Sequence, residues 1–213
     1  MAAQAVTNEE KIETPSEDFL VEQDFYLKAG IHIGTKFRTK YMQPFIYKTR
    51  PDGLSVLNIQ KIDERIRLAV NMLAQYEPDE VLVVCRRENG WRPLKLLNKY
   101  TGIRIVPGRY PPGILTNTNL ENFVEAKALL VSDSWPDRNA VDDAIRVGIP
   151  VVGLCDTNNQ ANNLDLVVPC NNKGKKSLEL FYYILTKEYL RAKNLLTPEL
   201  DSKIKVEDFM KED

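Results

Sequence analysis

The sequence has very few of the side chains that carry out enzymatic chemistry. It contains a single histidine, His32, and three cysteines, none of them in a C-x-x-C pair. A Ser–His–Asp triad would have to use that one histidine, and zinc sites need clustered ligands. We therefore expect His32 to be a packed or hydrogen-bonded side chain. Cys85 and Cys155 end apolar runs, and we expect them to be buried as small hydrophobic residues.

Long apolar runs and targeting signals are missing as well. No stretch approaches the roughly 18 consecutive apolar residues that a membrane span requires. The N-terminal residues do not combine a positively charged start with an apolar block, so they do not resemble a secretory signal. These absences predict a cytoplasmic protein without a membrane partner.

The glycine-rich loops of nucleotide-binding enzymes are absent too. No G-x-G-x-x-G follows an expected strand, and the NKGKKS run at 172–177 fails the P-loop pattern because Pro169 stands where its first glycine belongs. Asp133 and Asp156 each follow a strand, which is compatible with magnesium or acid–base chemistry, but capping and turn roles are favoured. The sequence predicts no cofactor and no enzyme. A nucleotide- or small-molecule-binding α/β module stays open as the alternative function.

Charge is unevenly distributed along the chain, although the formal net charge is only −1. Residues 1–24 carry one base and seven acids, and residues 197–213 carry three bases and six acids. The body between them has 25 bases and 17 acids, a net charge of +8. A basic body favours a polyanionic partner, because neutralising phosphates releases counterions. The two acidic tails are expected to be solvated and mobile.

Short apolar runs alternate with helical patterns and predict an α/β fold. We expect strands at residues 54–59, 81–85, 103–106, 128–131, 151–155 and 166–168, and helices at 61–76, 93–100, 137–147 and 177–194. Several runs are apolar throughout, which is typical of parallel strands covered on both faces. The alternation predicts a three-layer α/β/α sandwich around a mostly parallel sheet. The expected buried stripes include Ile62, Ile66, Ala69, Val70 and Leu73 in the first helix and Val141, Ala144 and Ile145 in the third.

Residues 25–51, ahead of this core, form a different kind of segment. The segment contains no acid and interleaves cations with aromatic side chains, and its glycines and Pro44 argue against one continuous helix. We expect a short helix near residues 24–29 followed by an extended arm. The predicted divisions are an acidic N-terminal tail at 1–24, a basic aromatic arm at 25–51, an α/β/α core domain at 52–196 and an acidic C-terminal tail at 197–213.

Ligands of open parallel sheets usually bind at the loops that follow the strands. Here those loops contain cations, amides and aromatic side chains, which suit phosphates, riboses and bases better than bond-making chemistry. The cations and aromatic rings of the arm likewise suit an RNA backbone with stacked or splayed bases. A solvated basic surface, with the aromatic rings in the core, is the plainer alternative. The residues predicted to bind RNA are Lys36, Arg38, Lys40, Tyr41, Arg86, Arg87, Arg92, Lys95 and Arg109.

Four stretches closely resemble the S-two family of small-subunit ribosomal proteins. They are FYLKAGIHIGTK at 25–36, GLSVLNIQK at 53–61, PGRYPPGILTN at 107–117 and GIPVVGLCDTN at 148–158. The resemblance runs from about residue 24 to 195, with the motifs in matching order. It implies a flavodoxin-like core that binds small-subunit ribosomal RNA and other small-subunit ribosomal proteins. It also implies a place near the messenger exit region, where messenger RNA is a further candidate partner.

Two absences indicate which branch of that family the chain resembles. Bacterial members insert a long coiled-coil hairpin after the Leu-Thr-Asn motif, whereas residues 118–127 leave no room for one here. The eukaryotic kin, the SA or laminin-receptor-like proteins, carry a long C-terminal extension that this sequence lacks. The resemblance is therefore to the archaeal type and implies a structural constituent of the small ribosomal subunit. An RNA-binding protein acting outside the ribosome is the remaining alternative, which cosedimentation with small subunits would distinguish.

Overall fold

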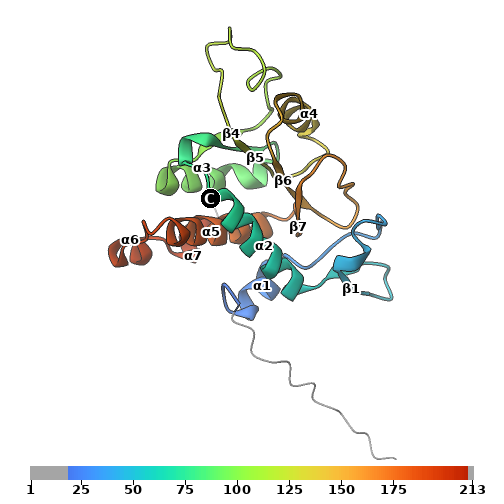
Figure 1. Cartoon of the computed structure of the whole chain (residues 1–213). Helices are drawn as coiled ribbons and strands as arrows, with labels where there is room; N and C mark the ends of the chain where they lie inside the picture. Colours follow the sequence, from blue (N-terminus) through green and yellow to red (C-terminus); the bar gives the residue numbers. More distant parts are fainter. Residues whose placement is uncertain (1–18, 211–213) are drawn as a thin grey trace, which may run out of the picture.

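The computed structural model describes residues 19–210, which are built around a five-stranded parallel sheet (Figure 1). The strand order is β4-β3-β5-β6-β7, which in chain order is the 2-1-3-4-5 arrangement of flavodoxin-like folds. The strands are β3 (Val81–Cys85), β4 (Arg104–Pro107), β5 (Ala128–Val131), β6 (Val151–Cys155) and β7 (Leu166–Pro169). Every residue of β3, β5 and β6 is buried, as the continuous apolar runs predicted. The predicted α/β sandwich is confirmed.

Helices cover the two faces of the sheet unequally (Figure 1). One face packs against α2 (Ile59–Leu73), α3 (Trp91–Thr101) and α5 (Lys175–Ala192), which together form the larger apolar cluster. The other face packs against α4 (Arg138–Val147) and the apolar side chains of the loop between β4 and β5. That loop contributes Tyr110, Ile114 and Leu115 in place of a helix.

Capping and apolar stripes explain where the helices begin and which side of each helix packs on the sheet. In α2 the Asn58 side chain accepts the Gln60 N–H at 2.9 Å, and the five predicted stripe residues are buried. In α4, Val141 and Ala144 are buried as predicted, but Ile145 is 47% exposed, so that part of the prediction is wrong. The buried side of α4 is centred on Ala140 and Ala144, and Ile145 lies about a quarter turn beyond it.

Helix α5 is the longest helix and runs through the centre of its layer. It contacts α1, α2, α3 and α7, and its side chains Leu178, Phe181, Leu185 and Tyr189 are all buried. Among residues 19–210 there is no helix with the length and apolarity that a membrane crossing needs.

The first expected strand does not belong to the parallel sheet. Residues Ser55–Leu57 form β2, which pairs antiparallel with β1 (Ile46–Thr49) in a separate two-stranded sheet. A tight turn joins the two strands, in which the Arg50 N–H donates to the Leu54 carbonyl at 2.8 Å and Gly53 has a positive φ of 87°. This local hairpin pairs β2 with the preceding segment, so a strand is present within the predicted 54–59, but its expected place in the parallel sheet is wrong.

The basic segment at 25–51 is folded against the core. The predicted short helix is present as α1 (Gln23–Ala29), but Tyr26, Ile31, Met42 and Phe45 join the main apolar cluster. The short 3-10 helix η1 (Gln43–Phe45) leads into β1. The expectation of an extended arm is therefore wrong, because these four apolar side chains hold the segment on the core, although Phe37, Tyr41 and Tyr47 stay exposed. The proposed division at residue 51 stays a prediction.

A buried carboxylate ties this segment to α2. Asp63 accepts hydrogen bonds from the Tyr26 hydroxyl at 2.7 Å, the Leu20 N–H at 2.9 Å and the Arg67 Nε at 2.8 Å. These bonds fix residues on both sides of the predicted boundary between tail and arm. Most of the acidic N-terminal tail, residues 1–18, lies outside the described residues.

The C-terminal acidic segment also folds onto the core as far as Met210. It forms α6 (Pro198–Lys203) and α7 (Val206–Met210). Phe209 is fully buried, with its ring centroid 6.4 Å from Tyr100 and 5.7 Å from Tyr183. The expectation of a solvated tail is wrong for this part, because Phe209 and Ile204 bury apolar surface. Residues 211–213 lie outside the described range.

Replacing Phe209 tests how firmly this segment is held. We expect Phe209→Ala to lower the free energy of unfolding by about 3 kcal/mol, because it removes a buried aromatic ring from the contact with α3 and α5. Glu207→Ala, an exposed change in the same helix, is the matched control and should leave stability within about 0.5 kcal/mol. Urea unfolding measures both variants. Equal midpoints for wild type and Phe209→Ala would show that α7 contributes nothing to the core.

Candidate nucleic-acid interface

The carboxyl ends of the strands form the edge at which the predicted ligand loops meet. After β3 the chain enters α3 on one face, and after β5 it enters α4 on the other face. Neighbouring loops therefore diverge between β3 and β5, which is the usual position of ligand sites in this topology. Arg86 and Arg87 follow β3, and Asp133 and Trp135 follow β5.

Asp133 is buried and is fully engaged by neighbouring loops. Its Oδ2 accepts two bonds from the Arg87 guanidinium, one of them from Nε at 3.0 Å. Its Oδ1 accepts the Trp135 N–H at 3.1 Å and the Asn159 side-chain amide at 2.8 Å. The predicted turn role is confirmed, together with an ion pair that the sequence did not predict. Little of this carboxylate is left for a metal, and residues 19–210 contain no cluster of metal-ligating side chains.

Asp156 is likewise committed to structure. Its Oδ1 accepts the Thr157 N–H at 2.6 Å, and its Oδ2 accepts the Lys173 ammonium at 2.9 Å. Asn159 joins the same network, because its Oδ1 accepts the Asp156 N–H at 3.0 Å and the Asn172 amide at 3.2 Å. The loops after β5, β6 and β7 are therefore connected by buried polar contacts.

The two arginines after β3 have different roles. Arg87 is half-buried and neutralises Asp133, whose side chain is almost completely buried. Arg86 is exposed, and its guanidinium donates only a long 3.3 Å bond to the Pro136 carbonyl. Arg86 is the one of the two that can turn toward an external phosphate at little cost, whereas moving Arg87 would leave a buried carboxylate unpaired.

The basic segment reaches this same edge. The Thr39 N–H donates to the Thr157 carbonyl at 3.0 Å, and the Thr39 hydroxyl donates to the Asn159 carbonyl at 2.9 Å. These bonds fix the stretch from Lys36 to Tyr41 against the loop after β6. All four residues predicted there to bind RNA are exposed, namely Lys36, Arg38, Lys40 and Tyr41.

The remaining three predicted residues lie toward α3 and the outer strand β4. The Arg92 guanidinium donates to the Asp208 carbonyl of α7 at 3.2 Å, which ties it to the C-terminal segment. Lys95 is exposed on α3. Arg109 is exposed in the loop after β4, where the Gly108 N–H donates to the Cys85 carbonyl at 2.8 Å and holds that loop beside the end of β3.

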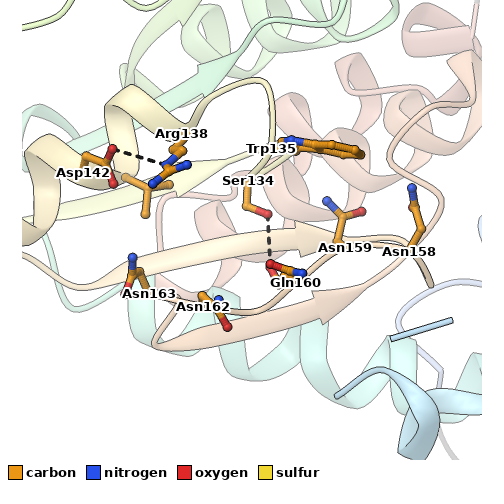
Figure 2. Close-up of a pocket in the computed structure, with 10 residues that line it drawn as sticks. Ser134, Trp135, Arg138, Asp142, Asn158, Asn159, Gln160, Asn162 and Asn163 are labelled. Atoms are coloured by element: carbon orange, nitrogen blue, oxygen red, sulfur yellow. Dashed lines mark hydrogen bonds and ion pairs between the residues drawn. The ribbon is translucent and has the colours of Figure 1, made fainter. Parts of the chain in front are cut away.

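Several residues at this edge were missing from the predicted set. Trp135, Lys175 and Lys176 are exposed, and Lys173 reaches Asp156 and Asn158. The sequence could have indicated these residues, because all four lie in segments that follow expected strands. A groove of about 340 Å³ also lies here, between the start of α4 and the loop at 158–163 (Figure 2).

The isolated histidine and the cysteines have the roles expected from composition. His32 is half-buried, and burial lowers the pKa of its imidazole. All three cysteines are buried free thiols, and burial raises the pKa of Cys155 to about 12. Such thiols are protonated and unreactive at neutral pH.

Asp137 is a carboxyl at this edge whose pKa is strongly raised. It is buried, its Oδ2 accepts the Arg86 N–H at 3.3 Å, and its Oδ1 has no partner among the described residues. Burial raises its pKa to about 7, the charge of Asp133 adds to this rise, and Arg86 and Arg87 oppose it. The carboxyl therefore opposes folding when it is ionised.

The sign of the resulting pH dependence follows from this raised pKa. Below about pH 4 the carboxyl of Asp137 is protonated in both states, and between about pH 4 and 7 only the unfolded chain releases its proton. Stability therefore falls as the pH rises through this window. We expect the free energy of unfolding of Asp137→Asn, relative to that of wild type, to increase by on the order of 3 kcal/mol as the pH rises from 4 to 7. Urea unfolding measures this, with Asp142→Asn as control, and a pH-independent difference would contradict it.

Comparisons with known protein sequences identify the family of the chain. The chain matches the family described as "Ribosomal protein S2" over residues 26–126 and 120–192. It is 48% identical over 192 residues to the small ribosomal subunit protein uS2 of Nanoarchaeum equitans, covering 90% of this chain and 96% of that protein. The uS2 proteins of Methanococcus maripaludis strain C5 and Saccharolobus solfataricus are 45% and 43% identical, covering 86% and 90% of this chain and 84% and 83% of their own lengths. Matches of this extent show that the chain belongs to the ribosomal protein S2 family.

Proposed function

We propose that this chain, a structural and non-enzymatic protein of the small ribosomal subunit, binds small-subunit ribosomal RNA through the cations at the carboxyl edge of its sheet. The observation that carries the proposal is the meeting of two distant segments at that edge. The stretch from Lys36 to Tyr41 is hydrogen-bonded to the loop after β6, and Arg86 projects from the loop after β3. The exposed cations of both segments can therefore contact one folded RNA.

The division of charge between buried and exposed groups favours such binding. Three acids at this edge, Asp133, Asp137 and Asp156, are buried, whereas Arg86, Lys36, Arg38 and Lys40 are exposed. Exposed cations gain from phosphates by releasing counterions, and arginine can grip a phosphate with two N–H groups. We include Arg87, Arg92, Lys95 and Arg109 in the proposed set, with Arg87 and Arg92 held in part by intramolecular contacts.

The neighbourhood of the protein is part of the proposal. We infer that it contacts other small-subunit proteins and lies near the messenger exit region of a cytoplasmic ribosome, where messenger RNA is a candidate partner. Support comes from the similarity to archaeal uS2 proteins and from the short loop between β4 and β5, which has no coiled-coil insertion. The exposed Ile145 and Val147 on α4 give this face apolar surface for a protein neighbour.

Removing three exposed cations tests the proposal without disturbing the buried network. We expect the triple variant Lys36→Ala, Lys40→Ala and Arg86→Ala to keep its stability and to enter reconstituted small subunits roughly tenfold less well, because three phosphate contacts are lost. Arg87 is left in place, because its removal would strand the Asp133 carboxylate. Gradient sedimentation with quantitative detection of the protein measures incorporation.

A matched control removes the same charge from the opposite edge of the sheet. Arg104 and Lys127 lie at the amino ends of β4 and β5, and Lys193 follows α5, and all three have acidic partners that are themselves accessible. The triple alanine variant of these residues should enter subunits as wild type does. Equal loss in the two triple variants would mean that net charge, and not this edge, governs assembly.

A further inference from the structure

One end of the groove beside the cationic edge is lined by an exposed tryptophan, Trp135. Trp135 is 76% exposed, and its indole has no aromatic or cationic partner within residues 19–210. Burial of this ring contributes little to folding, so its apolar face is available to a ligand. Figure 2 shows the ring at one end of the groove, above Asn158 and Asn159.

Trp135 stands between two hollows of different chemistry. On one side it lines a hollow with Arg86, Arg87 and Pro136. On the other side it lines the groove that continues along the start of α4 and the loop at 158–163. The cationic hollow suits a phosphate. The groove next to it has a volume of about 340 Å³, near the lower end for ligand pockets, so it can hold a small chemical group.

The opposite wall of the groove is a row of amides with unused hydrogen-bonding capacity. The side chains of Gln160, Asn162 and Asn163 line the groove, are exposed and make no hydrogen bond within residues 19–210 (Figure 2). Their loop is nevertheless fixed, because Asn159 is held by Asp133 and the Ser134 hydroxyl donates to the Gln160 carbonyl at 3.5 Å. Each amide presents a donor and an acceptor, which matches the edge of a nucleobase.

The groove itself carries no net charge. Arg138 and Asp142 line it and form an exposed pair with an Nε–Oδ2 distance of 3.5 Å, which contributes little to stability and can rearrange. A neutral, amide-lined cleft ending in an indole suits a base, whereas the adjoining arginines suit the phosphate attached to it. A fully paired helix cannot place a base there, because its bases are stacked and its edges are paired.

We propose that this groove binds one unpaired base of the small-subunit ribosomal RNA, stacked on Trp135 with its edge toward the amides and its phosphate beside Arg86. The inference rests on the proposed function and refines it, since it assigns recognition of a splayed nucleotide to a site separate from the basic segment. It also predicts that the wild-type protein shields a base edge in addition to the RNA backbone. A purine should be preferred, because it offers the larger stacking surface.

Chemical probing of the RNA with the full-length protein tests the inference. Dimethyl sulfate reports unpaired adenine and cytosine edges, and hydroxyl radicals report the backbone, both on the full small-subunit ribosomal RNA. We expect wild-type protein to protect at least one unpaired base that becomes reactive again with Trp135→Ala, while the backbone footprint is retained. Affinity should fall roughly tenfold, as expected for the loss of one base–aromatic stack.

Three further variants keep the outcomes distinguishable. Trp135→Phe, which keeps an aromatic face, should retain the base protection, and Gln160→Ala with Asn162→Ala should lose it in part. Leu68→Ala, an exposed change on α2 outside the groove, should match wild type. Identical base protection by wild type and Trp135→Ala would overturn the inference and leave the proposed function standing. Absence of any backbone footprint with wild-type protein would overturn both.

Discussion

The structure depends on one buried carboxylate, Asp133, which holds three loops of the carboxyl edge together. Arg87 reaches it from the loop after β3, and Asn159 reaches it from the loop after β6. Asn159 in turn contacts Asn172 after β7, and its carbonyl accepts the Thr39 hydroxyl of the basic segment. A buried charge with this many donors is strongly stabilised, and breaking any one bond leaves a polar group unpaired. The edge is therefore preorganised before any RNA arrives.

Because Asp133 and Asp156 are paired with groups inside the protein, the exposed cations are available to a partner. Lys36, Arg38 and Lys40 have no acidic partner within residues 19–210, and Arg86 makes one long bond to a carbonyl. A rigid display of cations limits the conformational entropy that binding removes, and the phosphates supply the attraction. The same network fixes the neutral groove next to Trp135. One set of buried contacts thus supports backbone binding and, in our proposal, base recognition.

The sequence could predict the parallel sheet and its helices because their signals are local. The run at 81–85 is apolar throughout, and the stripe from Ile62 to Leu73 has helical spacing, so burial alone determines both. Periodicity does not report which strand is the partner of β2, which pairs with its neighbour β1, or the docking of Phe209, which depends on contacts between distant segments. In the candidate site, too, local features could be predicted and contacts between separate loops could not. Exposed cations such as Arg86 were identifiable from the topology, whereas the pairing of Arg87 with Asp133 and the cavity beside Trp135 depend on how separate loops pack in three dimensions.

The salt dependence of RNA binding tests most directly whether the cations of this edge hold phosphates. The dissociation constant for full-length small-subunit ribosomal RNA can be measured between about 0.1 and 0.5 M potassium chloride by filter binding, for wild type and for the variant lacking Lys36, Lys40 and Arg86. If these cations contact phosphates, the slope of log affinity against log salt should become shallower by roughly 0.7 to 0.9 for each contact removed. Identical slopes for the two proteins would contradict the account.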